Sequence, residues 1–393
     1  MIIKPRIRGF ICTTAHPRGC AANVDAQIAY VTSQGGVAGG PKRVLLVGAS
    51  SGYGLASRIV AAFGCEAATL GVSFEKAPRD SRTASAGWYN NRAFEARARA
   101  RGLYVETLDG DAFSDAVKQQ AIDTIAADLG QIDLLVYSLA SPVRQHPRTG
   151  QLHRAVIKPL GESFHVKTLN VDKAIVRTVD LAPADEAETA ATVAVMGGED
   201  WEFWIDALAG AGLLADGCRT VSYTYIGSEL TWPIYWHATL GKAKEDLDRA
   251  ARAINAQLGD IGGRAQVAVL KAVVTQASAA IPVVPLYNAL LFDVMKTQGS
   301  HEACIDHIYR LFGTALYGGS PEVDEAGRLR LDAWELAAEV QDEMRRRWPL
   351  VSTGTLGELA DLEGYRADFL KLFGFGIEGV DYDEDLDPAL SEL

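Results

Sequence analysis

The chain has 393 residues, 48% of them hydrophobic, and a formal net charge of −12. This composition supports a large folded core and excludes intrinsic disorder, while the acidic charge argues against nucleic acid or an anionic membrane as a main partner. The five cysteines are scattered without paired spacing, so neither a disulfide framework nor a metal site is predicted. With no signal peptide and no run of 18 apolar residues, we expect a cytoplasmic protein without a membrane span.

Residues 1–40 predict an N-terminal extension that precedes the main fold. Apolar residues between Ile2 and Ile11, including Phe10, stand among proline, glycine and threonine, which indicates a short strand or hairpin. A helix is expected from Asn23 to Ser33, with its cap near Asn23. The glycine-rich stretch 35–41 then leads into the first strand of the main fold.

A glycine-rich turn follows that first buried strand. The sequence runs Val44-Leu-Leu-Val-Gly48-Ala-Ser-Ser-Gly52-Tyr53-Gly54 and continues as a helix from Leu55 to Phe63. Glycines let the backbone approach a pyrophosphate, and the helix start presents free N–H groups to that charge. The G-x-x-x-G-x-G spacing differs from the common dinucleotide fingerprint and resembles the short-chain dehydrogenase/reductase version of the turn. The alternative is a strand–helix loop with no ligand.

Strands and helices alternate beyond this turn. Further strands are predicted over Ala67–Phe74, Leu103–Leu108 and Ile132–Ala140, and the helices between them over Arg79–Arg101 and Ala116–Leu129. Parallel strands need crossover helices of this kind. The alternation therefore predicts an α/β fold, a Rossmann-like doubly wound parallel sheet.

Several residues at the ends of these strands are placed to contact a dinucleotide. Glu75 lies about 20 residues after the glycine turn, where a carboxylate can accept hydrogen bonds from both adenosine ribose hydroxyls. It would also repel a 2′-phosphate, which favours NAD(H) over NADP(H), unless it is an ordinary strand-end carboxylate. Asp111, with Ala112 beside it, is placed to reach the adenine amino group, although aspartate is also common in turns. Leu139 and Ala140 end the fourth strand and would bring backbone close to the cofactor ribose.

The regular alternation breaks after Pro142. Residues 143–200 are predicted to form an insertion that covers the site, with hairpin-like stretches at Gln151–Ile157, Phe164–Leu169 and Ala174–Val179. The later helices are expected at Trp201–Leu208, Lys242–Leu258, Tyr287–Lys296 and His301–Leu311, and the later strands at Arg219–Ile226 and Gln266–Val274. Residues 312–393 form a C-terminal extension that ends in an acidic, solvated tail at Asp381–Asp387. We treat residues 1–393 as one enlarged domain.

A group of tyrosines precedes the helix predicted from Lys242. A tyrosine and a nearby lysine can form a phenolic acid, because the ammonium stabilises phenolate and also contacts the nicotinamide ribose. At about 100° per residue, one continuous helix would place Lys242 on the side of Tyr235 and Lys244 on the far side. Pro233 and Gly241 indicate that the helix starts after Tyr235, which leaves the choice open.

Other interpretations of this cluster do not involve catalysis. The aromatic residues could form a wall with solvated lysines around it. His237 is interpreted as a packing residue near a helix start rather than as the acid.

Taken together, these residues resemble the FabV-type trans-2-enoyl reductases, a divergent branch of the short-chain reductases that act on enoyl-acyl carrier protein or enoyl-CoA. The resemblance covers nearly the whole chain and rests on Met1–Cys12, His16-Pro, Gly19-Cys20, Gly48–Tyr53, Tyr137–Pro142 and Phe373–Tyr382. The family's Tyr-x8-Lys pair corresponds to Tyr235 and Lys244, so the resemblance selects Lys244. It also implies that Tyr225 contacts the substrate.

The resemblance further implies that Val273, Val274 and Thr275 line the nicotinamide end of NAD. The full set of predicted cofactor contacts is Gly48, Ala49, Ser50, Ser51, Gly52, Tyr53, Phe74, Glu75, Asp111, Ala112, Leu139, Ala140, Lys244, Val273, Val274 and Thr275.

The residues and the resemblance predict one reaction, the NADH-dependent reduction of a trans-2-enoyl thioester with no metal required. Hydride adds to C3, and Tyr235 hydrogen-bonds or protonates the enolate oxygen, with Tyr225 as a second phenol nearby. We expect a monomer. The alternatives are a carbonyl reductase of the short-chain type and, in another class, a non-catalytic NAD-binding regulator.

Overall fold

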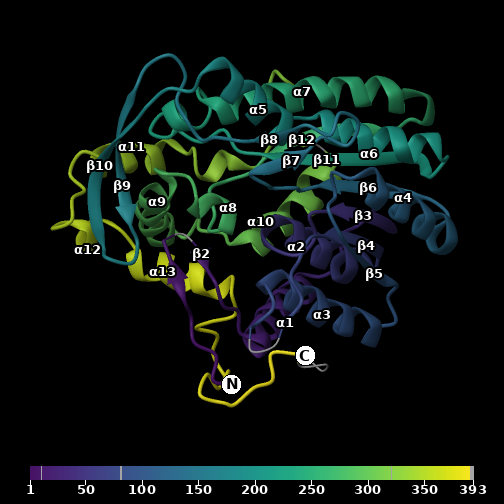
Figure 1. Cartoon of the computed structure of the whole chain (residues 1–393), viewed down its shortest axis with the longest axis horizontal. Helices are drawn as coiled ribbons and strands as arrows, with labels where there is room; N and C mark the ends of the chain where they lie inside the picture. Colours follow the sequence, from purple (N-terminus) through teal and green to yellow (C-terminus); the bar gives the residue numbers. More distant parts are fainter. Residues whose placement is uncertain (10, 80–81, 320, 390–393) are drawn as a thin grey trace.

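A seven-stranded parallel sheet forms the centre of the computed structural model, which describes residues 1–9, 11–79, 82–319 and 321–389. The strand order is β13-β12-β11-β6-β3-β4-β5 (Figure 1). The chain thus runs from β3 to one edge and returns beside β3 to build the other half, which is the doubly wound order. The predicted α/β fold is confirmed. The strands are β3 (Arg43–Val47), β4 (Ala68–Ser73), β5 (Val105–Asp109), β6 (Ile132–Tyr137), β11 (Leu214–Thr224), β12 (Arg264–Val269) and β13 (Leu329–Arg330).

Helices cover both faces of this sheet. One face carries α1 (Pro17–Gln34), α2 (Gly52–Ile59), α3 (Ala86–Ala100) and α10 (Cys304–Arg310), and the other carries α4 (Asp115–Thr124), α6 (Glu199–Gly210) and α7 (Thr239–Leu258). Within β3, Val44 and Leu46 pack into the first layer, and Leu45 and Val47 pack into the second. Because both faces are buried, β3 reads as a continuous apolar run instead of an alternating one.

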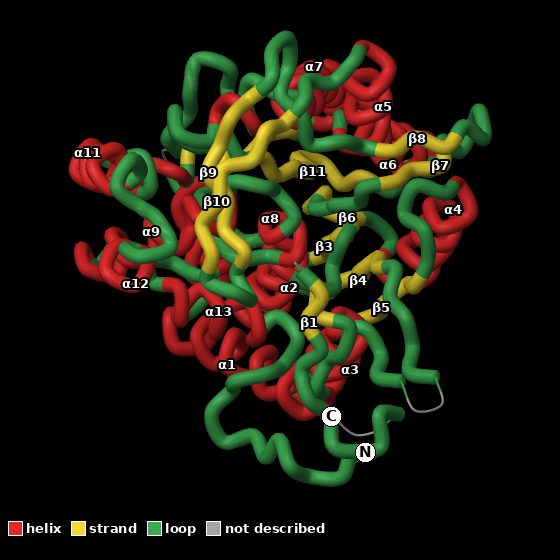
Figure 2. Tube along the Cα trace, turned by 60° about the vertical axis from the view of Figure 1, so that its left-hand side comes forward, coloured by secondary structure: helices red, strands yellow, loops and turns green. Residues whose placement is uncertain are grey.

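A third core lies beside the sheet and contains much of the C-terminal extension. It is built on α9 (Val284–Gln298), which packs against α11 (Ala338–Arg347) and α13 (Leu362–Lys371). The antiparallel hairpin of β9 (Phe164–Asn170) and β10 (Ile175–Leu181) lies against the same helix (Figure 2). The short helices α8 (Gln276–Ala279) and α12 (Leu356–Leu359) complete this region.

Residues 143–200 fold as two hairpins, which contain the three predicted hairpin-like stretches, and as a helix that the sequence analysis did not predict. β7 (Val143–Gln145) pairs with β8 (Leu152–Arg154), and α5 (Glu186–Met196) packs on α7. The acidic run that begins at Asp185 caps α5, because the Asp185 carboxylate accepts the Glu188 N–H and the Glu188 carboxylate accepts the Asp185 N–H. The N-terminal hairpin is also present as β1 (Ile7–Arg8) and β2 (Ile11–Cys12), while Phe10 lies outside the described residues.

The N-terminal helix starts earlier than predicted. α1 begins at Pro17 instead of near Asn23, and its cap is His16, whose Nδ1 accepts a hydrogen bond from the Gly19 N–H at 3.1 Å. Proline suits the first helical position because its missing N–H would have no intrahelical partner there. Histidine is an uncommon cap, so the prediction placed the start at the next asparagine.

Other boundaries also differ from the prediction; β6, for example, ends at Tyr137 and not at Ala140, and β11 begins at Leu214 and not at Arg219. The helix expected over Arg79–Arg101 is α3, which begins only at Ala86, and residues 80 and 81 lie outside the described part. The strand expected over Gln266–Val274 ends at Val269, where its neighbour β11 also ends at Thr224. Beyond that point the apolar residues of the chain turn away from the sheet and line cavities.

The acidic tail is solvated, as predicted, since the side chains of Asp383 and Asp385 are 84% and 87% exposed, but it is also held against the N-terminal segment. Its carboxylates contact the positively charged N-terminal segment through Met1–Asp385, Lys4–Asp383 (2.6 Å) and Arg18–Glu384 (2.8 Å). Leu386 is buried in the core around α9. Both termini therefore lie together at the bottom of the view in Figure 1.

Candidate active site

The glycine turn lies between β3 and α2, where the chain leaves the carboxyl end of the central strand. A Cβ on Gly48, which has φ of +89°, would lie 2.5 Å from the Ser138 carbonyl oxygen. A Cβ on Gly54 would lie 1.8 Å from the Gly48 carbonyl oxygen. Ser51 is the N-cap of α2 but makes no side-chain capping bond, so the first N–H groups of α2 remain available to a ligand. The turn has no room for side chains and presents donors, which fits a pyrophosphate.

Glu75 lies directly after β4 and contacts this turn. Ser50 Oγ donates to Glu75 Oε1 at 2.5 Å, and Ser85 Oγ, just before α3, donates to Glu75 Oε2. The Glu75 N–H also donates to Asp109 at the end of β5 (2.8 Å). A Cβ on Gly87 would lie 2.0 Å from Glu75 Oε1, so α3 closes tightly around the carboxylate. Glu75 is therefore held with both oxygens at the edge of the glycine turn.

The other predicted adenosine contacts are more varied. Phe74 is 78% exposed, and Ala112 is buried. The Asp111 carboxylate accepts the Phe113 N–H at 3.0 Å, so it already serves a local turn. Lys118 stabilises this turn, because its Nζ donates to the carbonyl oxygens of Ala112 and Phe113, each at 3.0 Å.

A cavity of about 210 Å³ opens at the carboxyl ends of β6, β11 and β12. In a doubly wound sheet, this edge beside the point where the strand order reverses is where ligands bind. The structure brings eight of the eighteen predicted site residues into this one cavity. They are Tyr53, Leu139, Ala140, Tyr225, Tyr235, Lys244, Val273 and Thr275.

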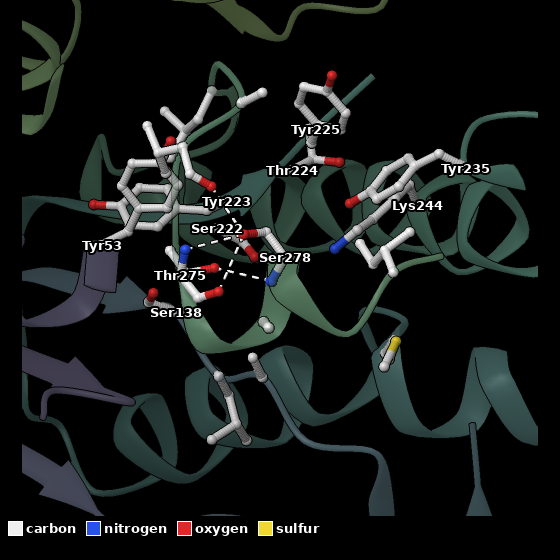
Figure 3. A pocket seen from close by; sticks show the side chains of 18 of the residues that line it. Tyr53, Ser138, Ser222, Tyr223, Thr224, Tyr225, Tyr235, Lys244, Thr275 and Ser278 are labelled. Carbon is white, nitrogen blue, oxygen red and sulfur yellow. Dashed lines mark hydrogen bonds between the residues drawn. The ribbon is translucent and has the colours of Figure 1, made fainter. Parts of the chain in front are cut away.

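Tyr235 and Lys244 reach this cavity from either side of a tight bend. Tyr235 follows the 3-10 turn Trp232–Ile234, and α7 starts only at Thr239. The Tyr235 carbonyl oxygen accepts the Gly241 N–H at 2.9 Å, and this bond folds the first turn of α7 back onto the segment that precedes the helix. A Cβ on Gly241 would lie 1.7 Å from the Trp236 carbonyl oxygen, so this close return requires glycine. Figure 3 shows the Tyr235 hydroxyl and the Lys244 ammonium directed into the same space.

The cavity also changes how readily these two groups ionise. Burial raises the pKa of Tyr235 above its usual value. Burial lowers the pKa of Lys244 to about 8, although the nearby Asp248 carboxylate acts in the opposite direction. Within the described part of the chain, no carboxylate or carbonyl oxygen pairs with Lys244 Nζ. The Lys244 ammonium, whose pKa is lowered, thus lies beside the Tyr235 phenol, whose pKa is raised.

Lys242 does not reach the cavity. Its ammonium pairs with Glu245 on the surface of α7 at 2.8 Å, and its side chain is 47% exposed. The helical-phase argument for Lys242 is wrong because it assumed one continuous helix through Tyr235, whereas the bend at residues 236–238 resets the phase. His237 is exposed and lies with its ring 5.4 Å from that of Trp232, outside the set that lines the cavity.

Tyr225 faces Tyr235 across the cavity. Their rings meet edge to face, with centroids 5.0 Å apart (Figure 3). The Tyr225 hydroxyl donates to Glu335 Oε1 at 2.8 Å. Burial, and then the Glu335 charge, raise the pKa of Tyr225 well above its usual value.

The segment Val273-Val274-Thr275 runs between two cavities. Thr275 caps α8 through a reciprocal pair of bonds with Ser278, and its Cγ2 would lie 3.3 Å from a Cβ on Gly52. Val273 and Thr275 line the cavity that holds Tyr235. Val274 lines a second cavity of about 290 Å³, together with Ser51 and Gly52 of the glycine turn. The predicted nicotinamide segment and the glycine turn are therefore neighbours in space.

Sequence reasoning missed several residues of the cavity. Lys271 is fully buried beside it, with Nζ donating to the Ala272 and Glu302 carbonyl oxygens at 2.9 and 3.1 Å. Glu335, in the C-terminal extension, accepts a hydrogen bond from the hydroxyl of Tyr225, which lines the cavity. No local motif marks these positions, since a single lysine or glutamate in an apolar stretch has no periodic signal. Sequence reasoning could have found Ser138, because this residue directly precedes the predicted Leu139–Ala140 pair.

Comparison with known proteins identifies the family. The family model described as "Trans-2-enoyl-CoA reductase catalytic region" matches residues 82–317. The chain belongs to this family. A second model, for the NAD(P)H binding domain of trans-2-enoyl-CoA reductase, matches residues 2–80, and a third, described as an enoyl reductase FAD binding domain, matches residues 323–386.

Curated relatives match this reductase over its full length. The enoyl-[acyl-carrier-protein] reductase [NADH] of Saccharophagus degradans is 58% identical, over 100% of this chain and 99% of the relative. Reductase 1 of the same description from Vibrio parahaemolyticus is also 58% identical, over 99% of this chain and 98% of the relative.

Solved structures agree with this assignment. The trans-2-enoyl-CoA reductase of Clostridium acetobutulicum in complex with NADH superimposes with a TM-score of 0.96 at 43% identity, covering 99% of this chain and 98% of that one. The Treponema denticola trans-2-enoyl-CoA reductase in complex with NAD gives a TM-score of 0.94 at 47% identity, covering 98% of each chain.

The residues of the reductase fit a nicotinamide dinucleotide but do not form a second dinucleotide turn. A flavin dinucleotide site of the Rossmann type needs a strand, a glycine turn and a helix. In the matched segment 323–386 the described strand is β13, and Leu331 and the 3-10 turn Asp332–Trp334 follow it without a glycine. The residues of this segment therefore do not fit FAD.

Within residues 1–9, 11–79, 82–319 and 321–389, no helix combines the length and apolarity that crossing a bilayer requires. In the same ranges, no three histidine, cysteine, aspartate or glutamate side chains converge as metal ligands.

Proposed function

We propose that this reductase uses NADH to reduce the C2=C3 double bond of trans-2-enoyl thioesters, carried by acyl carrier protein or CoA, in fatty acid synthesis. The proposal rests above all on one observation. Tyr235 and Lys244 meet in a cavity at the carboxyl edge of the sheet, with Thr275 between this cavity and the glycine turn. The relatives described as enoyl-[acyl-carrier-protein] reductase [NADH] support the same activity.

The two residues have different roles in this proposal. Bound NADH supplies the hydride for C3, and the electron pair of the double bond then moves toward the thioester oxygen. The Tyr235 hydroxyl donates a hydrogen bond or its proton to that oxygen, where charge develops. Lys244 holds the nicotinamide ribose and, as an ammonium, stabilises the phenolate that Tyr235 becomes. One proton then ends on C2 as the thioester carbonyl re-forms, and any proton placed on the oxygen returns to Tyr235, so that one hydride and one proton saturate the bond.

The remaining contacts follow the glycine turn outward. We propose that Gly48–Tyr53 hold the pyrophosphate and that Glu75, next to Phe74, accepts the adenosine ribose hydroxyls. Asp111 and Ala112 would face the adenine. Leu139 and Ala140 would face the ribose, and Val273–Thr275 the nicotinamide. The position of Glu75 between Ser50 and Ser85 at the edge of the turn supports its role.

We further propose that residues 1–393 act as one enlarged Rossmann-type unit, working as a cytoplasmic monomer. Residues 143–200 would cover the site, which is consistent with Met196 of α5 lining the cavity. The acidic net charge is consistent with a protein that binds neither nucleic acid nor a membrane surface.

The test is to follow NADH absorbance with crotonyl-CoA, with a longer trans-2-enoyl-CoA and with a trans-2-enoyl thioester of acyl carrier protein. We expect oxidation of NADH with formation of the saturated thioester. A matched 3-ketoacyl-CoA separates this activity from that of a carbonyl reductase. Absence of oxidation with every enoyl thioester would refute the proposal, and activity with the ketone alone would favour the carbonyl reductase.

A further inference from the structure

A fully buried carboxylate lies behind the cavity and belongs to the C-terminal extension. Glu335 is 0% exposed and directly follows the 3-10 turn Asp332–Trp334 after β13. It is distant in sequence from every residue of the proposed catalytic pair. The chain nevertheless buries it where the loops after β11 and β12 meet α9.

Three donors converge on this carboxylate. The Tyr225 and Tyr287 hydroxyls donate to Oε1 at 2.8 and 2.9 Å, and the Ala272 N–H donates to Oε2 at 2.6 Å. Burial raises the pKa of Glu335, while the Ala272 N–H and the nearby Lys271 ammonium oppose that rise. Only the ionised form offers acceptors to all three donors without bringing a proton of its own.

This arrangement decides what Tyr225 can do. A phenol has one proton, and Tyr225 directs its proton away from the cavity toward Glu335. The Tyr225 hydroxyl therefore has no proton left to donate to a substrate oxygen in the cavity. The ring is also fixed, because the same bond holds Tyr225 edge to face against Tyr235 at 5.0 Å.

We propose that Glu335 is a positioning residue for enoyl reduction: it accepts the hydrogen bond of the Tyr225 hydroxyl, locks the Tyr225 ring against Tyr235, and leaves Tyr235 as the single phenolic donor to the substrate oxygen. The inference rests on the proposed role of Tyr235. It revises the expectation that Tyr225 is a second donating phenol. In a buried site, an unpaired donor or acceptor costs free energy. The Tyr225–Glu335 hydrogen bond therefore keeps the Tyr225 proton from the substrate and leaves donation to Tyr235.

The decisive variant is Glu335→Gln, which has the same shape but one oxygen for three donors. The side-chain NH₂ of the glutamine must then face one of these donors. Either the Tyr225 hydroxyl loses its hydrogen bond to residue 335, or the Tyr225 ring shifts. We expect kcat/KM for crotonyl-CoA to fall by about tenfold or more, while the Kd for NADH, measured by fluorescence, stays within about twofold.

A double-mutant cycle separates positioning from general stability. If Glu335 acts through Tyr225, then Glu335→Gln lowers kcat/KM by no more than about twofold further in a Tyr225→Phe background. A purely structural role predicts the same loss in both backgrounds. Asp332→Asn is the matched control, because Asp332 is also buried but pairs with Arg330 and lines neither cavity. That control should lower the melting temperature and leave kcat/KM within about twofold of the wild type.

The outcomes are distinct. A wild type that reduces no enoyl thioester refutes the proposed function, not the placement of Glu335. An active wild type with an unaffected Glu335→Gln variant, or with equal losses in both backgrounds, overturns the inference. If Glu335→Gln does not fold, the same cycle is run with Glu335→Asp, which keeps the charge and withdraws the acceptor from Tyr225. The same two results then decide the question.

Discussion

Two lysines that are two residues apart on α7 have opposite environments. Lys242 is paired with Glu245 at the surface, whereas Lys244 points into the cavity with its pKa lowered to about 8 by burial. Residue chemistry alone could not separate them, because both lie near Tyr235 in the sequence. They differ because residues two positions apart on a helix point in different directions, Lys242 to the surface and Lys244 into the cavity.

The two lysines should respond differently to removal of their charge. We expect Lys244→Met to weaken NADH binding and to lower kcat by about tenfold or more, because the cavity loses its ammonium. Lys242→Met should stay within about twofold, since an exposed ion pair contributes at most about 1 kcal/mol. Steady-state kinetics and NADH titration of both variants provide the measurement. A severe Lys242 variant beside a healthy Lys244 variant would contradict the assignment.

Tyr235 is expected to matter for turnover and not for cofactor affinity. Tyr235→Phe keeps the ring that packs against Tyr225 but removes the hydroxyl that would meet the substrate oxygen. A loss of about 10²-fold or more in kcat is expected, with the Kd for NADH nearly unchanged. Stopped-flow single turnovers and fluorescence titration would measure the two quantities separately. Near-normal turnover would remove Tyr235 from the mechanism.

Glu75 is expected to set the preference for NADH. Two hydroxyls of the adenosine ribose can donate to its carboxylate, while a 2′-phosphate would meet like charge a few ångströms away. In a partly desolvated site that repulsion costs on the order of 2–4 kcal/mol, or roughly 30- to 1,000-fold in kcat/KM. Because Ser50 and Ser85 already bind this carboxylate, Glu75→Ala should also loosen the glycine turn.

Comparison of both cofactors in wild type and Glu75→Ala measures this effect. We expect a strong preference for NADH in the wild type and a narrower ratio of kcat/KM in the variant. Equal use of NADPH by the wild type, or an unchanged ratio in the variant, would place Glu75 away from the ribose.

At the scale of elements, the sequence predicts what depends on neighbouring residues. The buried run of β3, the glycine turn and α2 follow from composition and spacing, and the structure contains them as a unit. The start of α7 does not follow in this way. It depends on Gly241 folding back onto the Trp236 carbonyl, a contact between chain segments that helical periodicity does not describe.

The end of β12 shows the same limit. Its apolar composition continues to Val274, but its hydrogen-bonding neighbour β11 ends at Thr224, so the strand ends at Val269. Where a strand ends is a property of the pair and not of one sequence segment. The predicted nicotinamide segment therefore lies in a loop, where it lines cavities instead of forming part of the sheet.

At the scale of the whole molecule, the site depends on residues that are remote in sequence. Glu335 supports Tyr225 from 110 positions away, and the tail beyond Tyr382 is held by Lys4 and Arg18 at the other terminus. Such contacts carry no local pattern. The family resemblance selected Lys244 because it encodes the tertiary arrangement indirectly, whereas composition and spacing do not.

A buried histidine should make the stability of the whole molecule depend on pH. His307 is 0% exposed, its Nδ1 lies 2.9 Å from Glu302 Oε2, and its Nε2 accepts the Lys271 N–H at 3.3 Å. That acceptor role requires neutral Nε2, since protonation would set one N–H against another. Burial lowers the pKa of His307 to about 4. Burial also lowers the pKa of His301 to about 4.

The sign of the effect follows from these values. Between pH 6.5 and 4 the unfolded forms of His301 and His307 bind protons that their folded forms do not, so the contribution of these two histidines to the free energy of unfolding falls as pH falls through this window. Although burial acts to raise it, hydrogen bonds from Arg310 and His307 bring the pKa of Glu302 down to about 2, so Glu302 stays ionised there. His307 alone should contribute a loss on the order of 2–3 kcal/mol.

Urea unfolding at a series of pH values between 7 and 4 measures this dependence. His307→Asn can still accept the Lys271 N–H but does not titrate, so it should reduce the proton uptake on unfolding by about one. His237→Asn, at an exposed position, is the control and should leave the slope unchanged. A His307→Asn slope equal to that of the wild type would mean that folded His307 takes up its proton as readily as the unfolded chain does. The neutral hydrogen-bonded geometry inferred for His307 would then be wrong.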